Sequence, residues 1–339
     1  LTGLGVVFYF STLLSDASIL SFYGSYLRQV GFLQWGYFYI FLAFLVLFLP
    51  KKEFKWVLGA LFFSGSLLSI YGILQHFGKD FILSAYGRGE LSSVVMGTLG
   101  HPNFLGQFLA PIVPVLIASA FLLKKWKRYF LLVLACVFLV SIFLTYSRGV
   151  FVGLFFGFSL FALWMFFRSR MKVRKKLALV LLALFIAVFG LMTLKHRVSF
   201  DSQNLRSLNS RVQMWEASIE HWEKHPFLGT GMSTFEIYFP EYVDEDFYYY
   251  EQGVDFNVDR PHNDFFEILV SGGVLGVIFY LGLFGYMMFL LFREKDPLTL
   301  GLIFGYFVYF GQNQFSFSMT VHWLLFAVIL GGIVINKQE

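Results

Sequence analysis

Long apolar runs recur along the whole chain, and they constrain its fold more than any other feature. Runs of about 20 apolar residues have the length that a helix needs to cross a hydrocarbon core about 30 Å thick. Hydrophobic residues make up 58% of the 339 positions and charged residues only 14%, whereas a soluble domain carries about 25% charged residues. The sequence therefore predicts an all-α polytopic membrane protein.

The apolar runs predict ten membrane segments that form a single transmembrane domain over residues 1–339. The first run, residues 4–14, is too short to cross a bilayer, and the chain begins at Leu1 without a methionine. We therefore expect N-terminal spans to be missing. The segments cover about 3–14, 31–49, 54–76, 103–123, 129–146, 149–167, 176–194, 263–292, 298–316 and 320–336.

Basic residues gather in the short loops on one side of these segments. Such loops face the cytoplasm, and the C-terminus is predicted to lie there too. The opposite, outer face carries or adjoins all seven histidines, so we place the active face outside. The net charge of +5 does not indicate nucleic acid, and the single cysteine, Cys136, excludes an intrachain disulfide. The basic loops hold Lys51, Lys52, Lys55, Lys124, Lys125, Lys127, Arg128, Arg168, Arg170, Lys172, Arg174, Lys175, Lys176, Arg293, Lys295 and Lys337.

A polar cluster stands at the mouth of the predicted segment 263–292. Charged side chains are energetically unfavourable at the entry of a membrane helix, so their presence favours a functional site. A plain helix start is the alternative, with Pro261 at the first turn and Asn263 or Asp264 capping free N–H groups. The cluster consists of Arg260, His262, Asn263, Asp264 and Glu267.

Two outer loops are informative. The loop 79–103 carries Gly87-Arg88-Gly89-Glu90 and Gly100-His101-Pro102-Asn103, which suit either a turn and helix cap or a ligand site. Residues 195–262 are long enough for an outer subdomain. There Ser210 and Gln213 form a capping-box pattern, which predicts an amphipathic helix near 211–224.

That helix has further predicted features. Its apolar stripe should lie against the membrane surface or the bundle. The acidic run that follows it could hold a divalent cation or form a solvated turn. The stripe is Val212, Trp215, Ile219 and Trp222, and the acidic run is Asp244, Glu245 and Asp246.

Two arginines and a histidine suggest chemistry at the outer face. Arg148 lies in a tight turn between two apolar runs, where it either snorkels or binds an anion. Arg211 is expected near a helix N-terminus, which favours anions. Together they could hold a pyrophosphate, with His262 as a general base. No phosphate loop, nucleophile elbow, HExxH motif or cysteine pair is present. Deep acidic relays, which a proton-coupled transporter needs, are also absent.

These residues resemble the O-antigen ligase and polymerase superfamily of bacterial envelope glycosyltransferases. The resemblance extends from about residue 24 to 335. It rests on His262-Asn263, nine residues and then Gly273-Val274-Leu275-Gly276. Supporting motifs are Ser147-Arg148-Gly149, Arg211 with Met214-Trp215-Glu216, Pro226-Phe227-Leu228-Gly229-Thr230-Gly231, and Gly100-His101-Pro102-Asn103.

The resemblance implies a GT-C-like helical enzyme with about twelve spans in the bacterial cytoplasmic membrane. The donor would be a glycan on undecaprenyl pyrophosphate, used at the periplasmic face. Arg148 and Arg211 would neutralise the leaving pyrophosphate, and His262 would take the acceptor proton as the anomeric carbon inverts. No metal or cofactor is implied. Further substrate contacts are expected from Arg88, Arg260, Asn263, His101 and Asn103.

The acceptor stays open in this reading. A ligase would use lipid A–core and a polymerase a growing glycan, while other members glycosylate proteins; the ligase is our first expectation. A lipid-linked glycan flippase is the rival from another class, but it would distribute charge across both leaflets. A structural scaffold would leave the arginines and His262 far apart.

Overall fold

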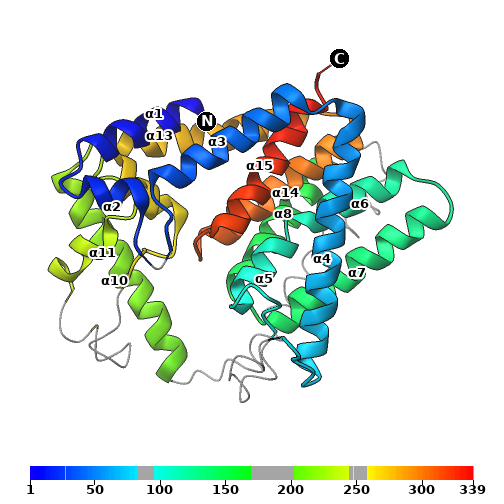
Figure 1. Ribbon diagram of the computed structural model, residues 1–339, viewed down its shortest axis with the longest axis horizontal. Helices are drawn as coiled ribbons and strands as arrows, with labels where there is room; N and C mark the ends of the chain where they lie inside the picture. The colour runs from blue at the N-terminus through cyan, green and yellow to red at the C-terminus, as the bar shows by residue number, and fades with distance from the viewer. Residues whose placement is uncertain (27, 83–94, 169–201, 244–246, 248–257, 339) are drawn as a thin grey trace. The chain divides into compact units, whose positions relative to one another are not determined.

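A computed structural model of the chain describes residues 1–26, 28–82, 95–168, 202–243, 247 and 258–338 (Figure 1). Every regular element among these residues is a helix. The chain forms two compact units, and each combines distant parts of the sequence. Unit 1 is Leu1–Tyr39, Lys195–Phe289 and Asn313–Thr320, and unit 2 is Ile40–Leu194, Leu290–Gln312 and Val321–Glu339.

The described residues confirm an all-α polytopic membrane protein. Five helical stretches are long and apolar enough to cross a membrane: Lys51–His76, Pro102–Leu122, Trp126–Thr145, Arg148–Arg168 and Asp264–Arg293. Shorter apolar helices are α1 (Thr2–Leu13), α3 (Phe32–Phe48) and α15 (Thr320–Ile335). The predicted segment 176–194 lies outside the described residues, so the predicted number of spans is not tested.

Unit 2 is built around close helix contacts at small residues. Helix α7 (Trp126–Thr145) packs against α4 (Phe54–His76), α5 (Pro102–Leu109) and α6 (Ile112–Leu122). Helix α14 (Pro297–Asn313) approaches α6 through Gly301, and it approaches Gly153 and Gly157 of α8 (Arg148–Arg168) through Val308. Small residues let membrane helices approach this closely.

The predicted segment 103–123 is two helices rather than one. Helix α5 ends at Leu109 and α6 begins at Ile112, with Ala110 and Pro111 between them. Proline has no backbone N–H to donate, so it interrupts the hydrogen-bond ladder at this point. By contrast, the predicted segment 54–76 coincides with α4.

Unit 1 contains α1, α2 (Ser18–Tyr23), α10 (Ser202–Lys224), α11 (Phe235–Tyr238), the 3-10 turn η4 (Phe239–Glu241) and most of α13 (Asp264–Arg293). Side chains from these elements form one buried apolar core beneath α10. The core consists of Met214, Ala217, Phe235, Phe239, Phe247, Val258 and Val270.

Helix α13 is broken at Gly273, whose backbone (φ 59°, ψ −161°) is not helical. The break frees two carbonyls and two N–H groups, and the turn 226–231 satisfies all four. Thr230 N–H donates to Val270 O at 2.9 Å, and Val274 N–H donates to Pro226 O at 2.8 Å. Gly231 N–H pairs with Ser271 O, and Leu275 N–H with Phe227 O, in the same way. The two glycine-containing motifs, 226–231 and 273–276, are therefore halves of one structural feature.

Candidate functional site

His262 lies in unit 1, two residues before α13 begins, and its backbone has a positive φ of 54°. Its ring is half-buried and packs edge-on against Phe317, with the ring centroids 4.9 Å apart. Burial lowers the pKa of His262 to about 4, and the positive charge of Arg211 adds to this effect. The imidazole is therefore neutral at neutral pH and can accept a proton.

Arg211 lies inside α10 rather than at its start. The helix begins at Ser202, so the predicted capping box at Ser210 is wrong, as is the expected helix N-terminus beside Arg211. Residues 202–209 contain neither glycine nor proline, so nothing in them stops the helix from extending upstream. The positive charge of Arg211 nevertheless helps to lower the pKa of His262, and a shared role of the two residues stays a prediction.

Of the predicted stripe on α10, Trp215 packs against the protein, and contact of the stripe with the membrane surface stays a prediction. Trp215 stacks on Phe266 (5.5 Å between centroids), and its indole N–H donates to Pro261 O at 3.0 Å. Val212 and Ile219, however, are exposed. The buried face of the helix is centred instead on Ser210, Met214, Ala217, Ser218 and His221. Trp215 thus anchors the backbone that leads into His262.

Arg260 is 5% exposed and lies within an internal polar network. Its guanidinium donates to Val30 O and Ser233 Oγ, each at 3.4 Å. It also lies 3.9 Å from Glu267 Oε1. These contacts tie the loop before α13 to the residues that precede α3. They give Arg260 a structural role; the predicted role in substrate contact stays a prediction.

Arg28 also belongs to this network. The guanidinium of Arg28 forms an ion pair with Asp259, and its central carbon, Cζ, lies 4.5 Å from the centre of the Phe317 ring. The guanidinium of Arg260 lies 5.8 Å from the same centre. Phe317 therefore contacts two cations and His262. The contacts of Arg28 join positions more than 200 residues apart, which no local pattern could reveal.

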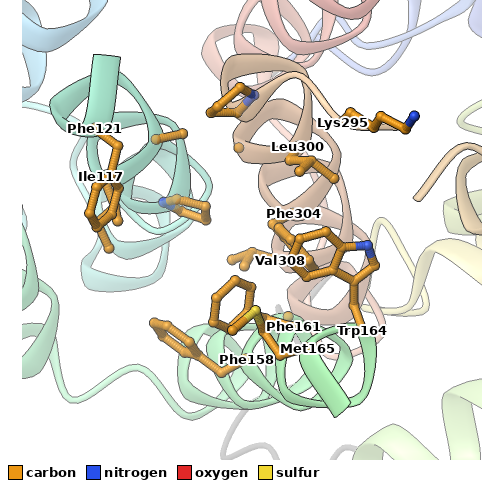
Figure 2. Close-up of a pocket in the computed structure, with 15 residues that line it drawn as sticks. Ile117, Phe121, Phe158, Phe161, Trp164, Met165, Lys295, Leu300, Phe304 and Val308 are labelled. Atoms are coloured by element: carbon orange, nitrogen blue, oxygen red, sulfur yellow. The ribbon is translucent and has the colours of Figure 1, made fainter. Parts of the chain in front are cut away.

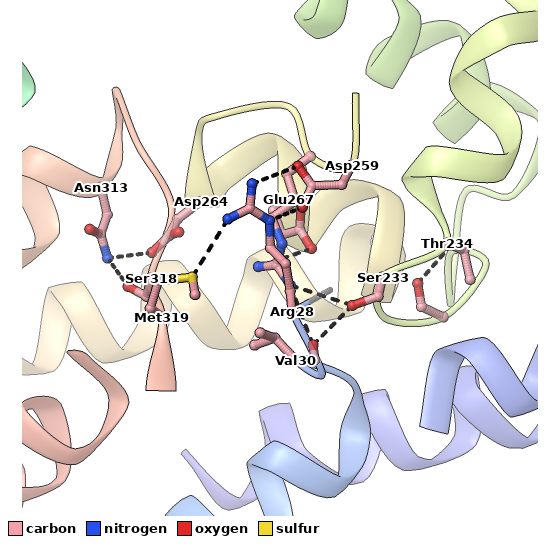
Figure 3. A network of polar contacts seen from close by, with 12 residues as sticks. Arg28, Val30, Ser233, Thr234, Asp259, Asp264, Glu267, Asn313, Ser318 and Met319 are labelled. Carbon is pink, nitrogen blue, oxygen red and sulfur yellow. Dashed lines mark hydrogen bonds and ion pairs between the residues drawn. The ribbon is translucent and has the colours of Figure 1, made fainter. Parts of the chain in front are cut away.

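Asn263 caps α13, as the plain helix-start alternative predicted. Its Oδ1 accepts from Phe265 N–H at 2.8 Å and Phe266 N–H at 3.4 Å. The neighbouring Asp264 accepts a hydrogen bond from Asn313 Nδ2 at 2.9 Å, and Asn313 also donates to Ser318 Oγ at 2.8 Å (Figure 3). Hydrogen bonds at Asn263 and Asp264 therefore fix the first turn of α13.

Arg148 belongs to unit 2, where it is the first residue of α8. The predicted tight turn is confirmed, because Tyr146 adopts the left-handed conformation between α7 and α8. Arg148 is exposed, so snorkelling and anion binding both stay open for its side chain. The buried Oγ of Ser147 has no hydrogen-bond partner among the described residues. Convergence of Arg148 with Arg211 and His262 stays a prediction.

His101 and Asn103, also in unit 2, form the predicted helix cap. His101 Nδ1 accepts from Asn103 N–H at 3.1 Å, and Pro102 occupies the first turn of α5. Direct substrate contact by either residue stays a prediction. His322, one of the seven histidines, is fully buried and bonds Phe104 O at 2.9 Å.

Two predicted features lie outside the described residues: Arg88, and the acidic run Asp244, Glu245 and Asp246. Within the described part of the chain, no group of three or more histidine, cysteine or acidic side chains is placed to hold a metal ion.

Comparison with known proteins identifies one domain. Residues 130–281 match the family model described as O-antigen ligase. The matched range includes Arg148, Arg211, His262 and the break at Gly273, whereas Arg88, His101 and Asn103 precede it. No curated protein matches the chain.

Proposed function

We propose a reaction for this chain on the premise that residues 130–281 make it a member of the O-antigen ligase and polymerase superfamily of membrane glycosyltransferases. The chain transfers a glycan from undecaprenyl pyrophosphate to an acceptor hydroxyl at the outer face of the bacterial cytoplasmic membrane. One observation carries this proposal: His262 is half-buried and neutral, and the positive charge of Arg211 helps to lower its pKa.

His262 acts as the general base. The acceptor oxygen attacks the anomeric carbon as the carbon–oxygen bond to the pyrophosphate breaks, and the hydroxyl proton passes to His262. The sugar inverts, and undecaprenyl pyrophosphate leaves. Packing against Phe317 restricts the imidazole, and a positioned base typically accelerates such a step by about 10²–10⁴-fold.

Arg211 links donor binding to the strength of this base. Its positive charge helps to hold the pKa of His262 low in the structure. A pyrophosphate bound at Arg211 would offset that charge and raise the pKa of His262 towards the working pH, where a general base is most effective. The base would therefore become effective only when the donor is in place.

Arg148 is the second anion ligand in this proposal. It stands at the first residue of α8, where the unpaired N–H groups and the positive end of a helix dipole favour phosphate oxygens. Ser147 Oγ adds a buried hydroxyl beside it. Cationic donors of this kind stabilise the charge that develops on a leaving pyrophosphate, so the proposal requires no metal ion.

Transfer of glycan to lipid A–core is the reaction we favour, and one assay separates it from the alternatives. Purified protein is incubated with undecaprenyl-pyrophosphate glycan, with and without lipid A–core. Transfer to the core identifies a ligase, and chain growth without the core identifies a polymerase. Movement of lipid-linked glycan across vesicles, with no glycosylated product, would contradict the proposal and indicate a flippase.

A pair of histidine variants tests the mechanism. We expect His262→Ala to lower turnover by about 10²–10⁴-fold while donor binding persists. His225, an exposed histidine near the end of α10, is the matched control, and His225→Ala should retain activity. Unchanged turnover in His262→Ala would remove this residue from the mechanism.

A further inference from the structure

Unit 2 contains an apolar groove between α6, α8 and α14 (Figure 2). Its volume is about 430 Å³. The walls are Ile117 and Phe121 from α6, Phe161 and Met165 from α8, and Leu300 and Phe304 from α14. All these residues belong to unit 2.

The groove has a polar mouth. An adjoining cavity of about 230 Å³ shares Trp164, Met165, Lys295 and Leu300 with it and adds Arg168 and Glu294. Arg168 and Lys295 are both exposed. An apolar groove beside a smaller cavity with two cations suits an amphiphile with an acidic head.

The acidic residue at the mouth is already engaged. Glu294 lies 3.5 Å from Lys337 Nζ, and its Oε1 accepts from the backbone N–H groups of Lys295 and Asp296 at 2.7 and 2.9 Å. Its charge is therefore largely compensated within the protein. The cations Arg168 and Lys295 set the charge that a ligand would meet.

The mouth is well separated from Arg148. Arg148 is the first residue of α8 and Arg168 the last of its 21 residues, so they lie roughly 30 Å apart along the helix at 1.5 Å per residue. Arg168 and Lys295 lie at the end that the sequence predicts to face the cytoplasm. A donor whose head is used at the opposite face would place no phosphate here.

We propose that this groove binds one anionic glycerophospholipid, with an acyl chain against α6, α8 and α14 and the phosphate at Lys295 and Arg168. Basic pockets between membrane helices at the cytoplasmic side are suited to acidic lipid heads. Trp164 forms part of the wall and is held by its indole N–H, which donates to Leu291 O at 2.9 Å. The bound lipid would fill a gap that the three helices leave open.

Trp164 provides a direct readout of occupancy. The full chain is placed in nanodiscs of phosphatidylcholine that contain a brominated-chain lipid, either phosphatidylglycerol or phosphatidylcholine, at equal mole fraction. The fluorescence of Trp164→Phe is subtracted from that of the wild type to isolate the Trp164 signal. We expect stronger quenching of this signal by the brominated phosphatidylglycerol.

Charge variants show whether the head group is recognised. Lys295→Gln should reduce the preference for phosphatidylglycerol about fivefold, because one basic residue near an acidic lipid surface contributes about that factor. Lys52→Gln removes an equal charge from another exposed loop of the same unit and should keep the preference. Native mass spectrometry should show the same order in the number of phosphatidylglycerol molecules retained.

Three results would overturn the proposal. Equal quenching by the two lipids would mean that the groove takes bulk lipid without recognition of a head. The absence of Trp164-dependent quenching would mean that no lipid chain lies beside Trp164 in the groove. If Lys295→Gln and Lys52→Gln lost the preference for phosphatidylglycerol equally, the preference would come from general surface charge and not from binding at the groove.

Discussion

Substitution of Gly273 by alanine tests how the break in α13 holds the site. A Cβ at this position would lie 2.4 Å from the carbonyl carbon and oxygen of Phe227, and these backbone atoms belong to the turn 226–231 that docks on the helix. The backbone of Gly273, at φ 59° and ψ −161°, is also one that essentially only glycine adopts. Alanine would therefore be strained whether or not the turn moves.

The loss of stability expected for Gly273→Ala has two parts. A residue held in such a conformation costs about 1–3 kcal/mol. Displacement of the turn would weaken the hydrogen bonds from Val274 N–H to Pro226 O and from Leu275 N–H to Phe227 O, each of which contributes about 0.5–1.5 kcal/mol. We expect Gly273→Ala to lower the free energy of unfolding by roughly 3 kcal/mol, which combines these two effects.

Helix α13 also supplies a matched control. Gly282 lies in the same helix, and a Cβ there would meet nothing within 4 Å. Because alanine favours a helix over glycine by about 0.5–1 kcal/mol, Gly282→Ala should be neutral or slightly stabilising. Thermal unfolding in detergent, followed by tryptophan fluorescence, measures both variants. If Gly273→Ala melts at the same temperature as Gly282→Ala, the break does not depend on glycine and the reasoning is refuted.

Three other predictions concern the same unit. Burial, with His225 and Lys224 nearby, lowers the pKa of His221 to about 4; its unfolded value is near 6.5. The neutral form of His221 should therefore stabilise the fold fully above pH 6.5, and this stabilisation should be lost as the pH falls towards 4. In thermal melts, His221→Gln should show a weaker dependence of the melting temperature on pH. Asn263→Ala removes the cap of α13 and should lower the free energy of unfolding by about 1 kcal/mol. Asn263→Asp should retain most of that stability. Equal melting temperatures for Asn263→Ala and the wild type would argue against the cap. Trp215→Phe removes the hydrogen bond to Pro261 O and should lower turnover more than stability, which parallel kinetics and melts would reveal.

Several apolar helices and the caps of α5 and α13 could be predicted from local sequence. Helix α4 has its predicted bounds because polar residues flank one long apolar run, and His101 caps α5 because Pro102 follows it. In these cases the residues that determine the structure are neighbours in the chain, so a pattern along the sequence contains the needed information.

The supports of the site could not be predicted in this way. The capping box at Ser210 was misleading because a local pattern cannot show whether a helix already continues from upstream. The contacts of Phe317 with Arg28, Arg260 and His262 join segments far apart in the chain. The break at Gly273 was also missed, because the turn that satisfies its freed backbone groups lies more than 40 residues upstream.

The break also sets how deep α13 can sit in a bilayer. The portion after it, residues 274–293, has about 20 residues and a length of roughly 30 Å, which matches the hydrocarbon thickness without help from the rest of the helix. The preceding turns, with Asp264, Glu267 and the nearby His262, are thus spared from burial among acyl chains. A thicker membrane would produce hydrophobic mismatch at this junction, so lipid chain length should set the height of His262 relative to the membrane surface.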